Sequence, residues 1–414
     1  MKASDSVKNY QSSLRMYTNY VVREIKKVCK EIGPRTSASA EEKKAQEYFA
    51  EQLKTCADDV KLEPVKVTPH AFMSWVVIDG ICMILAVIFS LIGLAEVSIA
   101  LTAIALICLV CEFLFYLEFL DKLPFYPKKT GYNVYGVKKP TGEVKQRIVF
   151  CGHSDSVWEW TFTYLGGKVL LFAGAGAAIG GIFFVLAVSI WTVINGGADE
   201  GILSILKYVQ LVFIPFFIFV CFFTNFKRPV LGANDNLTGA ISSIAVLKFL
   251  KDNDIDFEHT EVIGMSSTSE EAGLRGARAF AIAHKEELLA IPTAFVGVDT
   301  FTDYEYMAVY KRDMTGLVKN DSRVCNLLKK AGQLAGVELP FESVYVGASD
   351  AAAVSKVGIP AATLASMDPG PPRYYHTRLD TPEILQPKTI EKCLDICIQA
   401  TFLFDEKGLV EDYN

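Results

Sequence analysis

Four long apolar runs constrain this chain more than any other feature of its sequence. Residues 169–195 contain no charged side chain and exceed the ~20 residues that an α-helix needs to cross a bilayer. Residues 208–226 form a second uncharged run, and residues 75–94 and 97–117 each contain a single acid. Short linkers join the runs in two pairs, so the sequence predicts two transmembrane hairpins.

Helices buried in the core of a soluble protein are the alternative explanation for these runs. Residues 169–195 fit it poorly, because a soluble helix rarely stays apolar on every face over such a length. The mean hydropathy of +0.28 agrees with a membrane protein. Within the third run, Gly176 and Gly180 form a small-xxx-small pair, which predicts that two helices approach each other closely at these residues.

Two hairpins return the chain to the side of the membrane from which it started, so the polar segments would share one face. Positive side chains flank the runs on this face, namely Lys122, Lys128, Lys129, Lys168, Lys227 and Arg228. The short loops on the opposite face carry Glu96, Asp199 and Glu200, with Lys207 as an exception. Because Lys and Arg are enriched in cytoplasmic loops, we expect an integral membrane protein with its polar part on the cytoplasmic side.

Composition narrows the partners and the compartment. The formal net charge is −6 and no basic block is present, so we expect no nucleic-acid partner. Residues 1–20 are mostly polar, and we expect no signal peptide. Ten cysteines are scattered along the chain, several inside the apolar runs, which favours a reducing compartment.

Outside the apolar runs, strand patterns alternate with helix patterns. Six segments are typical of strands: 60–67, 132–139, 146–152, 260–267, 293–299 and 361–366. A helix is expected after Ser39, whose hydroxyl would cap it, with Glu42 in the third position of a capping box. The alternation predicts an α/β fold, a mostly parallel mixed sheet with helices on both faces. Such sheets bind ligands at the carboxyl ends of their strands.

Acidic and imidazole side chains gather at these predicted strand ends. Seven of them follow a strand, end a strand or precede the helix at 238–251: His153, Asp155, Asp235, Glu270, Glu271, Asp299 and His376. Each one alone is more typical of a turn, a cap or a solvated loop. Because all of them fall at the same edge of the sheet, we expect them to meet.

The residue types in this set indicate a metal. Carboxylate and imidazole ligands without cysteine suit zinc at a hydrolytic site. Two metals ~3.5–4 Å apart need a carboxylate that bridges them and further ligands for each. The set is large enough for that arrangement and leaves one glutamate and one aspartate for a general base and a supporting residue.

Five sequence blocks resemble, in this order, the signature blocks of the M28 zinc peptidases. They are HSDS (153–156), GANDNLTGA (232–240), SEEAGLRGARAF (269–280), VGVDT (296–300) and YYHTRLDTPE (374–383). The resemblance covers most of residues 30–402 outside the apolar runs. It implies a zinc-exopeptidase-like fold and the hydrolysis of peptide bonds by a metal-activated water.

The resemblance implies two zinc ions per chain and assigns five ligands to them. His153 and Asp299 would bind the first zinc. Glu271 and His376 would bind the second zinc. Asp235 would bridge the two ions.

Two further residues receive catalytic roles from the resemblance. Glu270 would be the general base, and Asp155 would hold His153 in its tautomer. The family pattern also implies a cis peptide bond from Asp235 to Asn236. One block departs from the pattern: the family's SDH sequence is Ser349-Asp350-Ala351 here, which bears on substrate contacts rather than on the metal ligands.

The hairpins would split the peptidase domain in the sequence. We expect peptidase segments at 1–72, 121–166 and 227–414, with transmembrane hairpins at 73–120 and 167–226. The predicted partners are a peptide substrate and the lipid bilayer, through the four helices, and the predicted activity is that of an aminopeptidase on short peptides. Two alternatives stay open: a glutaminyl-cyclase-like transferase with one zinc, and a non-catalytic membrane receptor or scaffold on a peptidase fold.

Overall fold

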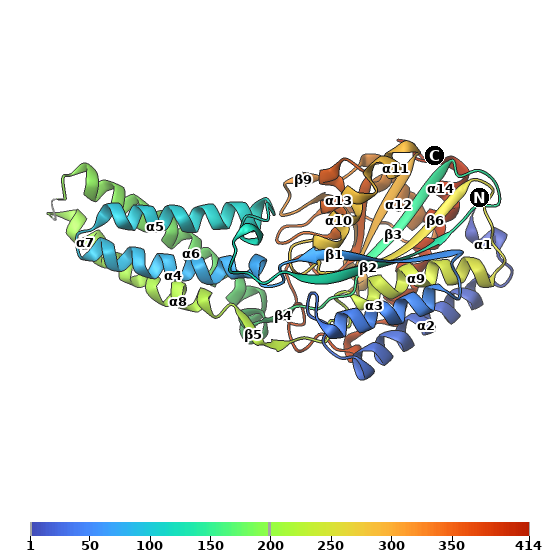
Figure 1. Ribbon diagram of the computed structural model, residues 1–414, viewed down its shortest axis with the longest axis horizontal. Helices are drawn as coiled ribbons and strands as arrows, with labels where there is room; N and C mark the ends of the chain where they lie inside the picture. The colour runs from blue at the N-terminus through green and yellow to red at the C-terminus, as the bar shows by residue number, and fades with distance from the viewer. Residues whose placement is uncertain (1, 198–199, 414) are drawn as a thin grey trace.

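The computed structural model describes residues 2–197 and 200–413. Figure 1 shows an α/β domain that carries both termini and, beside it, an elongated bundle of helices. Asp199, which the sequence places in a loop between two apolar runs, lies outside the described residues.

A mixed sheet forms the centre of the α/β domain. Its strand order is β1-β2-β6-β3-β7-β11-β8-β10, with β9 beside β8. The bounds are β1 (Asp59–Val67), β2 (Lys129–Lys138), β3 (Gln146–His153), β6 (Thr260–Ser267), β7 (Thr293–Phe301), β8 (Met307–Asp313), β9 (Val318–Lys319), β10 (Phe341–Ser343) and β11 (Ala361–Ser366). The central strands β6, β3, β7 and β11 are parallel, so their carboxyl ends meet at one edge. This confirms the predicted fold class.

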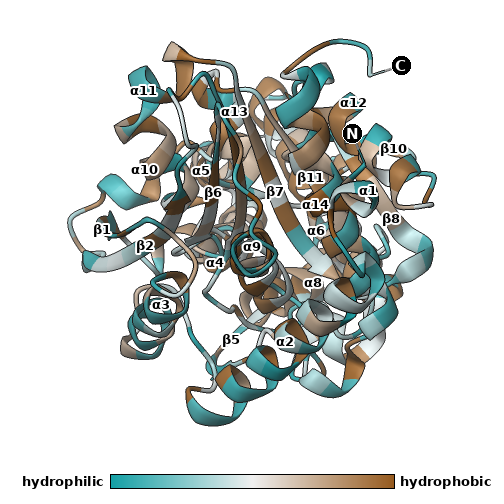
Figure 2. Ribbon diagram, turned by 90° about the vertical axis from the view of Figure 1, so that its right-hand side faces the viewer, coloured by the Kyte–Doolittle hydropathy of each residue, from teal (hydrophilic) through white to brown (hydrophobic). Residues whose placement is uncertain are grey.

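Helices cover both faces of the sheet (Figure 2). One layer contains α2 (Tyr10–Glu31), α3 (Ala40–Leu53), α9 (Leu237–Asp252), α12 (Ser322–Leu334) and α14 (Pro387–Lys407), with the short α1 (Ala3–Ser6) beside it. The other contains α10 (Arg275–Ala283), α11 (Lys285–Ala290) and α13 (Asp350–Val357). In Figure 2 the central strands are coloured as hydrophobic, and the outer turns of the helices as mostly hydrophilic.

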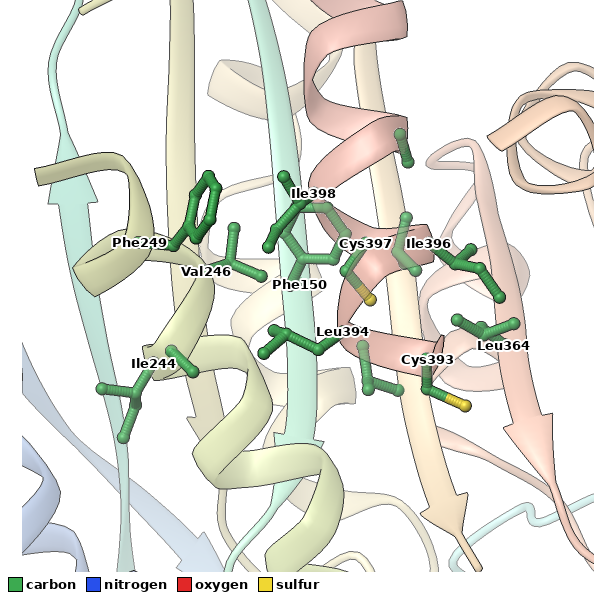
Figure 3. Packing of buried hydrophobic residues seen from close by; sticks show 14 of the residues in the cluster. Phe150, Ile244, Val246, Phe249, Leu364, Cys393, Leu394, Ile396, Cys397 and Ile398 are labelled. Carbon is green, nitrogen blue, oxygen red and sulfur yellow. The ribbon is translucent and has the colours of Figure 1, made fainter. Parts of the chain in front are cut away.

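The central position of β3 in the sheet explains why consecutive residues of this strand are apolar. Ile148 and Phe150 belong to the core cluster under α9 and α14, and Figure 3 shows Phe150 between these two helices. Val149 and Cys151 belong to the cluster on the opposite face, under α10 and α13. A strand buried on both faces needs apolar side chains in both alternating directions, and this burial fixes the end of β3 that carries His153.

Four helices within the described residues are long and apolar enough to cross a membrane. They are α4 (Ala71–Leu91), α5 (Ala95–Cys108) continued by a π-helical turn (Leu109–Leu114), α6 (Thr161–Ile194), and α7 (Ile202–Val209) continued through Gln210–Phe213 into α8 (Ile214–Cys221). They form two hairpins that leave the α/β domain and return to it (Figure 1). The short strands β4 (Trp158–Trp160) and β5 (Thr224–Pro229) pair at the base of the second hairpin.

The close helix contact in α6 involves different glycines from the predicted pair. A Cβ atom at Gly176 or Gly180 would meet no described atom within 4 Å, so the prediction for these two residues was wrong. A Cβ at Gly174 would instead lie 2.9 Å from the Phe219 ring, and one at Gly181 would lie 2.7 Å from Phe217. Gly174 and Gly181 are two helical turns apart and therefore share the face that packs against α8.

Three further parts of the fold differ from the sequence-based expectation. The helical pattern at 277–290 forms two helices, α10 and α11, that meet at His284. Strand β8 and helix α13 were not among the elements expected from the sequence. Both form because they pack against the apolar strand β11.

Candidate metal centre

The predicted site residues lie together at the carboxyl edge of the sheet. His153 ends β3, and Asp299 lies near the end of β7. The other positions are the turn after β6, the loop before α9 and the loop after β11. Six of the seven side chains line a single cavity, namely His153, Asp235, Glu270, Glu271, Asp299 and His376.

Asp235 occupies the middle of this cluster. Its Oδ1 atom lies 3.2 Å from His153 Nε2, and its Oδ2 atom lies 3.0 Å from His376 Nε2. His376 Nε2 is also 3.3 Å from Glu271 Oε1. Ligand atoms of His153, Asp235 and Glu271 all lie within 4.8 Å of one another. A carboxylate that turns one oxygen to each of two imidazoles can bridge two cations.

Several buried polar atoms of the cluster have no hydrogen-bond partner among the described residues, although buried polar atoms normally have one. Asp299 Oδ1 and His376 Nδ1 have no hydrogen-bond partner among the described residues, and Glu271 Oε1 likewise accepts no hydrogen bond from them. An unpaired buried polar atom costs roughly 1–3 kcal/mol, and such atoms often indicate a bound ion or water. Carboxylate oxygens and imidazole nitrogens are the donors that zinc takes at hydrolytic sites, so the residues fit this metal.

The electrostatics of the cluster also fit a cation. Burial raises the pKa of Glu270 well above its usual value. Burial and the negative charge of Asp235 do the same to the pKa of Glu271, and they raise the pKa of Asp299 to about 8. Burial opposes the ionisation of Asp235 too, but its bonds with two imidazoles outweigh this and lower its pKa. Several acids in one buried place repel each other unless positive charge lies between them.

Asp155 lies behind the cluster and connects its parts. Its Oδ1 atom accepts the backbone N–H of Glu270 at 3.0 Å, and its Oδ2 atom accepts the backbone N–H of Glu271 at 3.1 Å. Its Oδ1 is 3.3 Å from His153 Nδ1, and the Ser37 hydroxyl donates to Oδ2 at 2.6 Å. The side chain therefore holds the end of β3 and the turn after β6 in fixed register.

Sequence reasoning missed a second carboxylate with a similar task. Asp380 Oδ1 accepts the backbone N–H of Asn234 at 2.7 Å, and its Oδ2 accepts the backbone N–H of Asp235 at 3.0 Å. It thereby fixes the loop that presents Asp235. Its position in the block YYHTRLDTPE was the available signal. The peptide bond from Asp235 to Asn236 is cis, as the resemblance implied.

Two N-terminal residues also support the site and were not predicted to do so. The N–H of Glu42 donates to Ser39 Oγ at 3.0 Å, which confirms the predicted cap, whereas the Glu42 carboxylate accepts the N–H of Ala38 rather than that of Ser39 and so does not complete the capping box. The Glu42 carboxylate also accepts the backbone N–H of Ser269 at 3.0 Å, directly before the glutamate pair. Arg35, fully buried, donates to the carbonyl oxygens of Ser154 and Gly232 at 2.8 and 3.1 Å.

Aromatic rings enclose His376. Tyr375 stacks on its imidazole with ring centroids 3.8 Å apart, and Trp160 meets it edge-on at 4.3 Å. The backbone N–H of Trp160 donates to the carbonyl oxygen of His376 at 2.8 Å. Because Trp160 directly precedes α6, the base of the second hairpin is built into the site.

The fold and the cluster at its sheet edge define a zinc-peptidase type of α/β enzyme. Residues 219–401 match the sequence profile of Peptidase family M28. This part of the chain, together with the fold, supports a zinc peptidase of the M28 type. The matched range contains five of the seven predicted site residues, whereas His153 and Asp155 precede it, on the other side of the second hairpin.

Solved structures share this fold at low sequence identity. The aminopeptidase from Aneurinibacillus sp. strain AM-1 is 13% identical, with a TM-score of 0.54, and the alignment covers 97% of this chain and 95% of that one. BSAP, a zinc aminopeptidase from Bacillus subtilis, is 14% identical, with a TM-score of 0.55 and coverages of 93% and 94%. The Fimbriiglobus ruber glutaminyl cyclase is 14% identical, with a TM-score of 0.54 and coverages of 93% and 94%. Comparison with curated protein sequences gave no match.

Proposed function

We propose that this protein is a membrane-anchored aminopeptidase that uses two zinc ions to hydrolyse peptides with a free N-terminus. The observation that carries the proposal is the position of Asp235, with one carboxylate oxygen facing His153 and the other facing His376. A single carboxylate shared in this way is what a pair of metals ~3.5–4 Å apart requires. The M28 match and the zinc aminopeptidase of the same fold support the metal and the reaction class.

Five side chains would hold the two ions. His153 and Asp299 would bind one zinc, with Asp235 shared. Glu271 and His376 would bind the other. The unpaired oxygen of Asp299 and the 3.3 Å approach of Glu271 to His376 support this division.

Zinc, when bound, lowers the pKa of a coordinated water towards ~7 and polarises the scissile carbonyl. Glu270 would take a proton from the attacking water and deliver it to the leaving amine. Its carboxylate lines the cavity, with Oε2 3.9 Å from His153 Nε2. The Asp155 carboxylate fixes the main chain of Glu270, and Asp155 would orient His153 through its backbone carbonyl oxygen, 3.1 Å from Nδ1, and through Oδ1 at 3.3 Å. Its role would therefore be to position the groups that react.

The apolar helices would anchor the enzyme in a bilayer. Exposed apolar side chains cover their outer surfaces, including Ile88, Ile92, Phe183, Ile190 and Ile194. The flanking positive charges support a cytoplasmic position for the α/β domain. We propose that the peptidase domain consists of residues 1–72, 121–166 and 227–414, and that residues 73–120 and 167–226 form the two transmembrane hairpins.

A glutaminyl-cyclase-like transferase is the second candidate, because a solved glutaminyl cyclase shares this fold. It would bind one zinc and release ammonia from an N-terminal glutamine without cleaving a peptide bond. A non-catalytic receptor or scaffold is less well supported, since a retired active site would be expected to have lost some of the seven residues, and all seven are present.

The full chain, purified in detergent, tests these candidates. Metal analysis is combined with a panel of peptides that have either a free or an acetylated N-terminus, including peptides with N-terminal glutamine. Two zinc ions per chain and cleavage of free N-termini alone support the aminopeptidase. One zinc with ammonia release identifies the cyclase, and full metal loading without any turnover would overturn both.

A further inference from the structure

The metal-binding cluster is one wall of a cavity that continues between the apolar helices. The cavity has a volume of about 440 Å³ and is lined by the cluster and by side chains of α4, α6 and α8. Its helical wall includes Phe72, Val76, Met83, Gly176, Ile182 and Phe217. Met83 lies about 18 Å along α4 from Ala71, at ~1.5 Å per residue, so the cavity reaches well into the expected membrane region.

The shape and the lining of the cavity suit an apolar chain. Its volume falls within the ~300–1,000 Å³ of typical small-molecule sites. Aromatic and aliphatic side chains form almost all of its wall away from the cluster. A short polar peptide would leave this wall against water, whereas an alkyl chain would remove it from water, which is favourable in proportion to the apolar area covered.

One acid interrupts the apolar wall. Asp79 on α4 lines the cavity, is only 3% exposed, and has no partner for its Oδ1 atom within the described part of the chain. A buried acid inside a membrane-spanning helix is costly and commonly belongs to a functional site. A buried carboxylate with one unpartnered oxygen, lining a cavity that is continuous with the candidate metal cluster, indicates a ligand site.

We propose that the substrates of this enzyme are amides that carry a long alkyl chain close to the scissile bond, such as lipid-modified peptides or aminoacyl lipids. This inference rests on the proposed peptidase function and specifies its substrate class. The chain lies in the cavity between α4, α6 and α8, while the amide lies against the cluster. Hydrolysis breaks the C–N bond, with hydroxyl added to the acyl carbon and hydrogen to the amine, and needs no other co-reactant.

The first measurement is the dependence of kcat/KM on chain length. One probe series has the form leucyl-alkylamide, with the chain on the leaving amine, and the other has the form 2-aminoalkanoyl-anilide, with the chain on the acyl side. Chains of four to twelve carbons are compared in the zinc-loaded full-length protein, below the critical micelle concentration of each probe. We expect kcat/KM to rise at least tenfold with length in one series, which also identifies the side of the bond that bears the chain.

A matched pair of variants tests whether the cavity causes this rise. Gly176 is an exposed residue that lines the edge of the cavity, and a Cβ there would meet no described atom within 4 Å, so we expect the side chain of Gly176→Leu to fit there and to narrow the space for the chain. Gly180 lies on the same helix with equal room but does not line the cavity. Gly176→Leu should bring the ratio of kcat/KM for twelve and four carbons to near one, and Gly180→Leu should leave that ratio unchanged.

A binding measurement separates this inference from catalysis. Trp75 and Trp160 line the cavity, so a non-hydrolysable dodecyl amide isostere with a quenching group on its chain should reduce tryptophan fluorescence in wild type and much less in Gly176→Leu. Hydrolysis of short peptides without any chain-length effect would overturn the inference but keep the peptidase, with a bilayer lipid as the occupant of the cavity. Equal quenching in Gly176→Leu and wild type would also overturn it. Failure to hydrolyse any amide would overturn the peptidase itself.

Discussion

The Asp155 carboxylate accepts the backbone N–H of Glu270 at 3.0 Å. These residues come from two sequence blocks that are separated by the second apolar hairpin. The hydrogen bond joins the end of β3 to the turn after β6, and the other oxygen of Asp155 binds the next N–H of the same turn. The geometry of the candidate metal site therefore depends on a residue that is not one of the proposed ligands.

Replacement of Asp155 tests this dependence. In Asp155→Asn, an NH₂ group replaces one carboxylate oxygen and cannot accept a hydrogen bond, so one of the two bonds from the backbone N–H groups is lost. The substitution also removes the negative charge beside His153. We expect zinc affinity and kcat/KM to fall about 10- to 100-fold, as for other residues that orient metal ligands. Zinc titration and steady-state kinetics measure both quantities.

Ser37→Ala is the matched control for that variant. Ser37 donates to Asp155 Oδ2, so its loss keeps both backbone hydrogen bonds and the charge. The effect on zinc affinity should stay below about tenfold. Wild-type zinc affinity and kinetics in Asp155→Asn would contradict the positioning role.

The adjacent glutamates should respond differently to the same substitution. Glu270→Gln removes the proton acceptor and should lower kcat by about 10²–10⁴-fold while metal content stays at the wild-type level. Glu271→Gln removes a proposed ligand and should lower metal content. Metal analysis of both proteins, with Glu305→Gln at an exposed position as control, distinguishes the two roles. Unchanged zinc content in Glu271→Gln would show that the ligand assignment is wrong.

An ion pair at the base of the second hairpin predicts a pH effect on stability. Arg378 donates to both oxygens of the buried Glu159 at 2.6 Å. Burial opposes the ionisation of Glu159, but the bonds from Arg378 outweigh it and lower its pKa. Because the folded pKa lies below the unfolded value of about 4.3, the stabilisation is present above that pH and is lost as the pH falls through the folded pKa.

Glu159→Gln tests this ion pair. We expect it to lower the free energy of unfolding by about 1.5–3 kcal/mol near pH 7, because it removes charged hydrogen bonds. The difference from wild type should shrink below about pH 4, where the wild-type carboxylate is protonated. Thermal unfolding at several pH values in detergent measures it. A difference that does not change with pH would contradict the ionic contribution.

Two adjacent glycines of α6 give a prediction about helix packing. Gly181→Leu should destabilise the bundle by about 1–3 kcal/mol through overpacking, because its Cβ would lie 2.7 Å from the Phe217 ring. Gly180→Leu should be close to neutral, since a Cβ there meets no described atom within 4 Å. Thermal unfolding of both variants measures this difference, and Tm should be lower in Gly181→Leu than in Gly180→Leu. Equal Tm values would contradict the packing of α6 against α8.

The sequence was sufficient to predict six of the nine strands of the sheet and the strand ends near which the candidate site residues lie. Strands 146–152 and 260–267 contain the apolar stretches 148–152 and 262–265, which are buried on both faces of the sheet, and this pattern helps to show where the strands end. The residues that follow, His153 and Glu270 among them, could therefore be placed at one edge.

Other parts depend on contacts between segments that are distant in sequence. Glu42 fits the sequence pattern of a capping box, and nothing near it indicates that its carboxylate reaches Ser269. The helix contacts of Gly174 and Gly181 depend on which face of α6 turns towards α8, which a uniformly apolar sequence does not specify. The cavity could not be predicted either, because its wall combines His376 of the α/β domain with Met83 of the helix bundle. Its existence depends on how these two parts of the molecule pack together.

Zinc titration into the metal-free, full-length protein tests the central claim most directly. The account predicts two zinc ions per chain in wild type and weakened binding of both in Asp235→Asn, because that carboxylate would be shared. Aminopeptidase activity should return only as the zinc sites fill. A wild-type protein that binds no zinc, or an Asp235→Asn protein that still binds two ions with wild-type affinity, would contradict it.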